Sequence, residues 1–238
     1  MWNAIQKQFK IQWRDGLWMK LLMVGMALFG MGLMYILAVA TKEQESWFAM
    51  GTFLAGFVAA VACLVGTGLN FYTSFQIEVG FGCTRKHFFA SFYLYSLATA
   101  LMNVVVLWLI WLIENGIGTR LYEMETEVAM MPTLLWLGPF MALLLSMIGM
   151  TAAVLVMRFG KVAFWTLWVL WMVGFIGIPR FLGASREHPG SVYGMLGKGL
   201  LGFAGALPLQ IWLAVIFAVG VFLMAISYRI VMRQQVAA

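Results

Sequence analysis

The sequence predicts an all-α integral membrane protein with six transmembrane helices, forming a single transmembrane domain over residues 1–238. Of its 238 residues, 63% are hydrophobic and only 10% are charged, whereas soluble domains carry about 25% charged residues. Six segments longer than 17 residues contain no Asp, Glu, Lys or Arg: 21–41, 46–77, 87–113, 128–157, 162–179 and 199–228. Because a membrane-spanning helix needs roughly 20 apolar residues, this pattern indicates a polytopic membrane protein.

Residues 1–20 are expected to form an amphipathic helix along the inner membrane surface rather than a span. Their apolar residues recur at steps of three and four, and cationic residues lie beside this stripe. The stripe consists of Trp2, Ile5, Phe9, Trp13 and Leu17. The early charges and the lack of an apolar core with a small-residue cleavage site also predict that no signal peptide is removed.

The uncharged segments define the six expected spans. They are residues 21–41, 47–72, 88–113, 132–156, 162–178 and 209–231. Pro132 suits the first turn of span four, where a missing N–H costs nothing, and Pro179 ends span five. Between spans five and six, residues 199–207 are apolar but too short to cross, and Pro208 separates them from span six. They are expected to form a re-entrant or interfacial helix packed against protein.

Charge predicts that both termini face the cytoplasm. With the N-terminus inside, the inner segments hold ten Lys and Arg residues and the outer segments hold five. The positive-inside rule rests on this count. Attraction to anionic lipid then explains the net charge of +6, and no nucleic-acid partner is expected.

The chain is not expected to be an enzyme or to bind a metal or cofactor. Cys63 and Cys83 are too few for a zinc site or a disulfide framework. His87 and His188 lie at an interface and in an outer loop, so no span offers a nucleophile with its base. The nearest approach to a phosphate-binding P-loop, at residues 197–199, lacks the required Ser or Thr. No charged residue is predicted deep in a span, which disfavours an ion-coupled carrier.

Small residues recur every four positions along span two. They are Gly51, Ala55, Ala59, Cys63 and Thr67. Small residues let membrane helices approach closely. The stripe therefore predicts either packing within the chain or an interface with another subunit.

A possible translocation path is marked by Asn70 near span two and by Phe164, Trp168 and Trp171 on span five. The aromatic residues could line a route for a greasy substrate, although lipid contact explains most such residues. Asn70 and Asn103 are also well suited to hydrogen bonding between helices.

The inner loop of residues 76–87 combines apolar, acidic and basic residues with two glycines. A short helix held off the membrane by these glycines would suit docking onto a soluble partner, while an ordinary basic loop is the alternative. Thr84 suits the N-cap of span three. The candidate contact residues are Glu78, Val79, Phe81, Thr84, Arg85 and Lys86.

This topology resembles the membrane subunit of ABC-2-type transporters. The run Gly-Cys-Thr-Arg-Lys-His-Phe-Phe at 82–89 is similar to the "G-x-T-R-K/R" stretch between spans two and three of small bacterial permeases. These include exporters of phenol-soluble modulins and lantibiotic immunity transporters. The resemblance implies a second copy or a related permease, two separate ATPase subunits that hold ATP and Mg, and a coupling helix around Glu78–Lys86. It also implies that spans two and five line the path.

The expected function is therefore that of the membrane subunit of an ATP-driven exporter in a bacterial plasma membrane. Amphipathic or antimicrobial peptides are the expected substrates. One alternative is the substrate-binding membrane subunit of an energy-coupling-factor vitamin importer, which the long amphipathic N-terminus and the 76–87 loop disfavour. Another is a membrane immunity or sensor protein that sequesters a peptide without transporting it.

Overall fold

A computed structural model describes the backbone of residues 2–41, 49–80, 83–122, 130–178, 180, 183, 190–205 and 208–233. Every regular element in these ranges is a helix. Five helices are long and apolar enough to cross a membrane: Gln12–Ala40, Met50–Val79, Arg85–Gly118, Leu137–Phe159 and Gln210–Arg233. A shorter apolar helix covers Lys161–Met172. The all-α fold predicted from the sequence is thus confirmed for the described residues, and their long apolar helices suit a multi-pass membrane protein.

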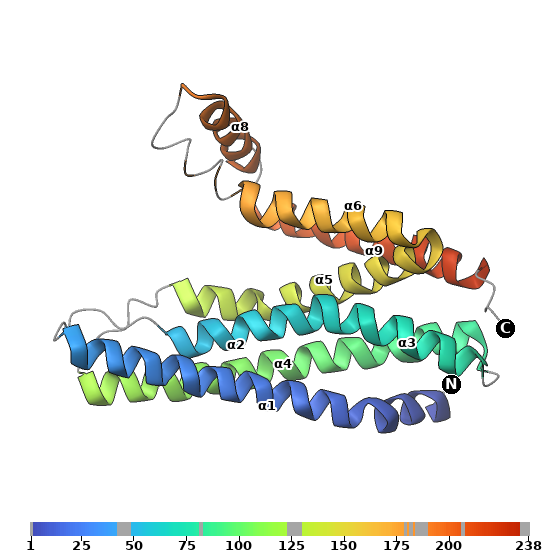
Figure 1. Ribbon diagram of the computed structural model, residues 1–238, viewed down its shortest axis with the longest axis horizontal. Helices are drawn as coiled ribbons and strands as arrows, with labels where there is room; N and C mark the ends of the chain where they lie inside the picture. Colours follow the sequence, from blue (N-terminus) through green and yellow to red (C-terminus); the bar gives the residue numbers. More distant parts are fainter. Residues whose placement is uncertain are drawn as a thin grey trace. The chain divides into compact units, whose positions relative to one another are not determined.

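The chain divides into two compact units. Unit 1 consists of residues 1–150 and 231–238, and unit 2 consists of residues 151–230. Helices α1, α2, α3 and α4 run alongside one another in unit 1 (Figure 1). All the close contacts that form the candidate site lie within unit 1.

Helix α1 (Trp2–Thr41) is continuous over 40 residues. The expected break between an interfacial helix of residues 1–20 and a span beginning at residue 21 is absent. Sequence patterning detects the change in composition at this point, but without a Pro or a strong breaker the backbone hydrogen bonds continue through it. Trp13 and Leu17 of the predicted stripe are exposed, and Gln12 is buried against neighbouring helices.

Helix α2 (Met50–Val61), the π-helical segment η1 (Ala62–Gly66) and helix α3 (Thr67–Gly80) follow one another without interruption. They cover residues 50–72 of predicted span two and continue eight residues beyond its expected end at residue 72. Residues 76–80 therefore form the last turns of α3 rather than a separate short helix. A π-helical segment adds one residue to a turn and is frequent at functional sites.

Helix α4 (Arg85–Tyr122) is 38 residues long and also exceeds its predicted span. At about 1.5 Å per residue it measures about 57 Å, against a hydrocarbon core of about 30 Å. Glu114, expected in the outer loop of residues 114–131, lies inside this helix and is fully buried. That placement corrects the expectation, because a helix has enough length to carry its charged end beyond the bilayer core.

Glu114 closes the N-terminus of α2. Its Oε1 accepts a hydrogen bond from the Gly51 N–H at 2.9 Å, and its Oε2 accepts bonds from the Thr52 N–H and hydroxyl, both at 2.6 Å. Ala49, at the N-cap position, supplies no side-chain bond. A carboxylate from another helix therefore satisfies donors that the start of a helix leaves open, and it also favours the positive end of the helix dipole.

Close backbone packing joins α1 to α2 at the same place. A Cβ on Gly30 would lie 2.7 Å from the Gly51 Cα, and a Cβ on Gly51 would lie 2.7 Å from the Ala27 carbonyl oxygen. Real side chains do not approach so closely, so both positions need glycine. The packing continues through a cluster of Met23, Ala27, Ala55 and Ile110.

Helix α5 (Met130–Phe159) turns into helix α6 (Lys161–Met172) through Gly160 alone, whose φ of 60° favours glycine. This turn lies between the expected end of span four at residue 156 and the expected start of span five at residue 162. A second π-helical segment, η2 (Val173–Gly177), extends α6, so residues 161–177 match predicted span five within one residue at each end.

Helix α8 (Val192–Gly205) begins earlier than the expected re-entrant segment at residue 199. Helix α9 (Leu209–Arg233) begins directly after Pro208, whose carbonyl accepts the N–H bonds of Ile211 and Trp212. Pro208 therefore starts the last helix, as its missing N–H allows.

Candidate functional site

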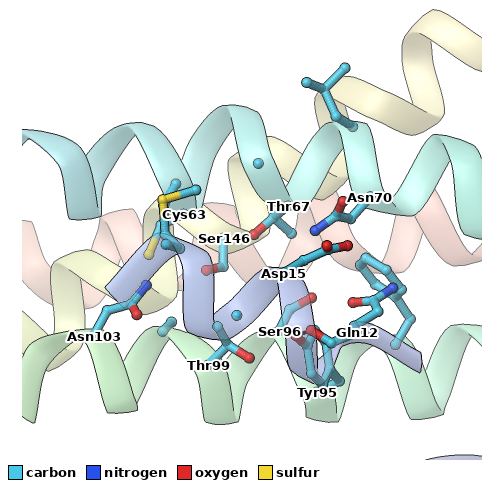
Figure 2. Close-up of a pocket in the computed structure, with 17 residues that line it drawn as sticks. Gln12, Asp15, Cys63, Thr67, Asn70, Tyr95, Ser96, Thr99, Asn103 and Ser146 are labelled. Atoms are coloured by element: carbon cyan, nitrogen blue, oxygen red, sulfur yellow. Dashed lines mark hydrogen bonds between the residues drawn. The ribbon is translucent and has the colours of Figure 1, made fainter. Parts of the chain in front are cut away.

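A polar cavity of about 190 Å³ lies inside unit 1. Its walls come from α1, η1, α3, α4 and α5, and Figure 2 shows the polar side chains gathered around it. These polar residues are Gln12, Asp15, Thr67, Asn70, Tyr95, Ser96, Thr99, Asn103 and Ser146. All belong to helices apolar enough to span a membrane. Polar groups on such helices face inward because lipid offers them no hydrogen bonds.

Gln12 fixes α1 against two other helices at this cavity. Its Nε2 donates to the Ser74 hydroxyl on α3 at 2.9 Å, and its backbone carbonyl accepts a bond from the Tyr95 hydroxyl on α4 at 3.1 Å. The Gln12 side chain is only 3% exposed. The residue therefore helps to close one end of the cavity wall.

Three buried polar atoms on the cavity wall accept no hydrogen bond from the residues that the structure describes. They are Gln12 Oε1, Asn103 Oδ1 and Ser146 Oγ. The side chains of Asn103 and Ser146 also lie beside the Cys63 thiol. A buried polar atom without a partner costs about 1–3 kcal/mol, so these atoms favour water or a ligand in the cavity.

The π-helical segment η1 shapes the same wall. Ala62, Cys63 and Gly66 line the cavity. On its other side, the Leu64 carbonyl oxygen packs against Gly149 of α5 so closely that a Cβ at residue 149 would overlap with it. The glycine thus lets α5 approach the widened turn and seal this side of the cavity.

The second candidate feature is the turn between α3 and α4, around residues 78–86. Glu78 and Val79 lie in the last turn of α3, and Arg85 and Lys86 begin α4. Thr84 occupies the N-cap position of α4, where its hydroxyl hydrogen-bonds with His87 Nδ1 at 2.9 Å and its carbonyl accepts the Phe88 N–H. The predicted contact residue Phe81 lies outside the described residues.

Arg85 ties this turn to the end of α9. Its Nη1 donates to the Met232 carbonyl at 3.0 Å, and both residues belong to unit 1. Positive charge is favourable at a helix C-terminus, where the last carbonyls lack partners. Arg85, which sequence analysis named as a candidate contact residue in the inner loop, is therefore held in place by the end of α9.

An aromatic cluster supports the turn from within. It consists of Phe71, Phe75, Phe88 and Phe92, all of them at most 2% exposed. Ring centroids lie 5.2 Å apart for Phe71 and Phe92, and 5.5 Å apart for Phe75 and Phe88. The i, i+4 spacing of Phe71 with Phe75 and of Phe88 with Phe92 was a signal for this cluster that sequence analysis missed. The contacts between these rings hold the end of α3 against the start of α4.

The predicted path residues fall in different parts of the chain. Asn70 lines the polar cavity in unit 1. Phe164, Trp168 and Trp171 lie on α6 in unit 2, and all three are exposed. Trp165 makes edge-to-face contacts with Phe164 and Trp168, so the aromatic residues form a continuous row along α6.

The small-residue stripe of span two faces helices of the same chain. Gly51 and Ala55 are buried against α1, and Cys63 packs with Ala100 of α4 and Ala142 of α5. Ala59 is partly buried against the Ala55 cluster. These contacts join helices of one chain, as the alternative of packing within the chain predicts.

Comparison with protein-family models, with curated proteins and with solved structures found no match to this chain.

Proposed function

We propose that this chain is the membrane subunit of an ATP-driven exporter and works with a separate ATPase subunit. The observation that carries the proposal is the connection between the α3–α4 turn and the polar cavity. Helices α3 and α4 both contribute polar residues to the cavity wall, and the turn joins the end of α3 to the start of α4. The residues are Thr67 and Asn70 of α3 and Ser96, Thr99 and Asn103 of α4. A partner that moves the turn would thereby move two walls of the cavity.

The turn has the properties of a surface that transmits movement. The aromatic cluster holds α3 to α4, and the Arg85 bond holds α4 to the end of α9. Displacement by a partner would consequently reach several helices together instead of deforming one loop. ATP binding in the partner would then favour one arrangement of the helices and substrate the other.

Six membrane crossings with both ends inside remain part of the proposal. The Arg85–Met232 bond brings the start of α4 and the end of α9 to the same side, which favours an even number of crossings between them. Helices α4, α5 and α9 supply three, so residues 161–177 of α6 and η2 would supply the fourth. The Gln12–Ser74 bond likewise favours two crossings between α1 and α3. The Lys and Arg count places this side in the cytoplasm.

The choice of peptides as the substrate class rests on the resemblance to small ABC-2-type permeases. The exposed row of Phe164, Trp165 and Trp168 on α6 is compatible with an amphipathic substrate, with lipid or with a second permease copy. A bacterial plasma membrane is the location that this resemblance implies.

Reconstitution tests the proposed function directly. The full chain, purified with the ATPase that accompanies it, would be placed in vesicles loaded with a fluorescent cationic amphipathic peptide. We expect peptide movement that requires ATP hydrolysis and stops when the ATPase carries a substitution at its catalytic carboxylate. Peptide binding without ATP-dependent movement would instead favour a sequestering immunity protein and contradict the proposal.

A further inference from the structure

The polar cavity offers hydrogen-bond acceptors for which the described part of the chain provides no matching donors. Gln12 Oε1 and Asn103 Oδ1 both lack partners, and their side chains are 3% and 2% exposed. They come from α1 and α4, on opposite sides of the cavity wall in Figure 2. A molecule that bound both oxygens would therefore have to carry more than one donor or to act together with water.

The cavity also carries a negative charge. Asp15 lines it while remaining exposed, so its carboxylate lies where the cavity meets the surface. The carboxylate is close enough to the Tyr95 hydroxyl to interact with it electrostatically. Among the described residues, no Lys, Arg or His lines the cavity. Its chemistry therefore favours a cation over an anion.

Lys20 provides a positive charge close to the cavity that could compete for this place. Its Nζ donates to the Gly16 carbonyl at 3.4 Å, a weak contact within one turn of α1. Gly16 lines the cavity, but Lys20 does not. The Lys20 ammonium group thus lies beside the cavity and leaves its two open amide oxygens without donors.

The size of the cavity limits what it can hold. At about 190 Å³ it is smaller than the roughly 300–1,000 Å³ typical of drug-sized ligands. It has room for a small organic cation together with a few waters, since a water occupies about 30 Å³. It is too small for a folded segment of peptide.

We propose that this cavity binds a small organic cation that carries N–H donors, such as a primary alkylammonium or guanidinium group. Asp15 supplies the opposite charge, the amide oxygen of Gln12 accepts a hydrogen bond from the cation, and the amide oxygen of Asn103 is reached through water. Charge-assisted bonds of this kind are about twice as strong as neutral ones. The inference needs only the cavity and is independent of whether an ATPase drives transport.

Cys63 provides a native probe because it lines the cavity and is 3% exposed. In a Cys83→Ser background, purified chain in nanodiscs would be treated with cationic, neutral and anionic methanethiosulfonates of similar size. Each rate would be divided by the rate of the same reagent with a free thiol. We expect the cationic reagent to modify Cys63 fastest and methylammonium chloride to protect it. Tetramethylammonium chloride, which lacks N–H donors, should not protect.

Matched variants then test the roles of the residues. Asp15→Asn should weaken protection by methylammonium about tenfold, equivalent to about 1.4 kcal/mol. Asn103→Leu should weaken it while leaving the overall charge unchanged. Lys161→Gln changes the net charge at a residue that does not line the cavity, and it should leave protection unchanged.

Equilibrium binding of radiolabelled methylammonium to the unmodified chain provides the second measurement. Saturable binding that Asp15→Asn weakens supports the proposal even if Cys63 reacts with none of the reagents. Absence of saturable binding overturns it, as does equal protection by methylammonium and tetramethylammonium. Binding that appears only in Lys20→Gln would identify Lys20 as the natural occupant and would also overturn the proposal.

Discussion

Glu114 Oε2 receives hydrogen bonds from both the backbone N–H and the hydroxyl of Thr52, each at 2.6 Å. A single buried carboxylate on α4 thus holds the first turn of α2. The Gly30–Gly51 approach of α1 and α2 lies at the same point, since Gly51 also donates to Glu114. Three helices are therefore fixed to one another at this end of unit 1.

Replacing Glu114 with Ala should destabilise the chain by about 2–4 kcal/mol, because two buried N–H groups and one hydroxyl lose their acceptor. Unfolding of the purified chain by sodium dodecyl sulfate, followed by circular dichroism, measures the effect. Thr52→Val removes only the hydroxyl bond and should cost less, and Thr52→Ser should be close to neutral. Equal stability of Glu114→Ala and the unsubstituted chain would contradict this role.

Gly149→Ala should disturb the packing of α5 against η1, because its Cβ would overlap with the Leu64 carbonyl. We expect a stability loss of about 1–3 kcal/mol, as for other overpacked sites. Gly25→Ala is the matched control, since a Cβ there meets nothing within 4 Å. It should be neutral or slightly stabilising, because Ala favours helix more than Gly does. A similar loss in both variants would show that the close approach is not the cause.

Membrane topology is tested by reporters. A reporter fused after residue 238 should be active only if it functions in the cytoplasm, and a tag within residues 123–129, after the end of α4, should be reached from outside. A cysteine placed between residues 184 and 189 should also react from outside if residues 161–177 cross the membrane. An inward-facing cysteine there would limit the chain to five crossings and place its ends on opposite sides.

Substitutions in the α3–α4 turn should uncouple the ATPase without unfolding the membrane subunit. Glu78→Arg reverses a charge at the end of α3 and should lower substrate-stimulated ATP hydrolysis. Arg85→Gln removes the guanidinium that holds Met232 and should have a similar effect. Loss of one partner of a buried charged contact typically costs about 2–5 kcal/mol, whereas a rim charge matters far less.

The control for the turn is Lys161→Gln, in the short turn between α5 and α6, which should leave hydrolysis unchanged. Elution volume from size-exclusion chromatography in detergent verifies folding of each variant. If both turn variants retained full substrate-stimulated hydrolysis, the partner would have to contact another part of the chain.

Composition could predict the fold class and most of the long helices, because lipid requires runs of apolar residues with few charges. Helix ends were predicted less well. Glu114 was assigned to a loop because its charge ended an apolar run, although its carboxylate caps α2 inside the bundle. Similarly, the change in composition near residue 20 does not interrupt α1. Charge patterns follow the membrane boundary, whereas helix continuity follows backbone hydrogen bonding.

The cavity could be predicted only in part. Asn70 was identified as a polar group near a span, but Gln12 was placed in an interfacial helix and Cys63 on a packing stripe. These three residues line one cavity because of how α1 is rotated against α3 and because η1 adds a residue to its turn. Neither feature produces a periodic pattern in the sequence. The Arg85–Met232 bond joins residues 147 positions apart and was equally invisible to sequence patterning.

The central claim is that a separate ATPase binds the α3–α4 turn. Cys83, which lies in that turn and is partly exposed, gives the most direct measurement. Its alkylation rate would be followed by peptide mass spectrometry with and without the ATPase. We expect the Cys83 rate to fall severalfold when the ATPase is bound. Equal Cys83 rates with and without bound ATPase would contradict the account.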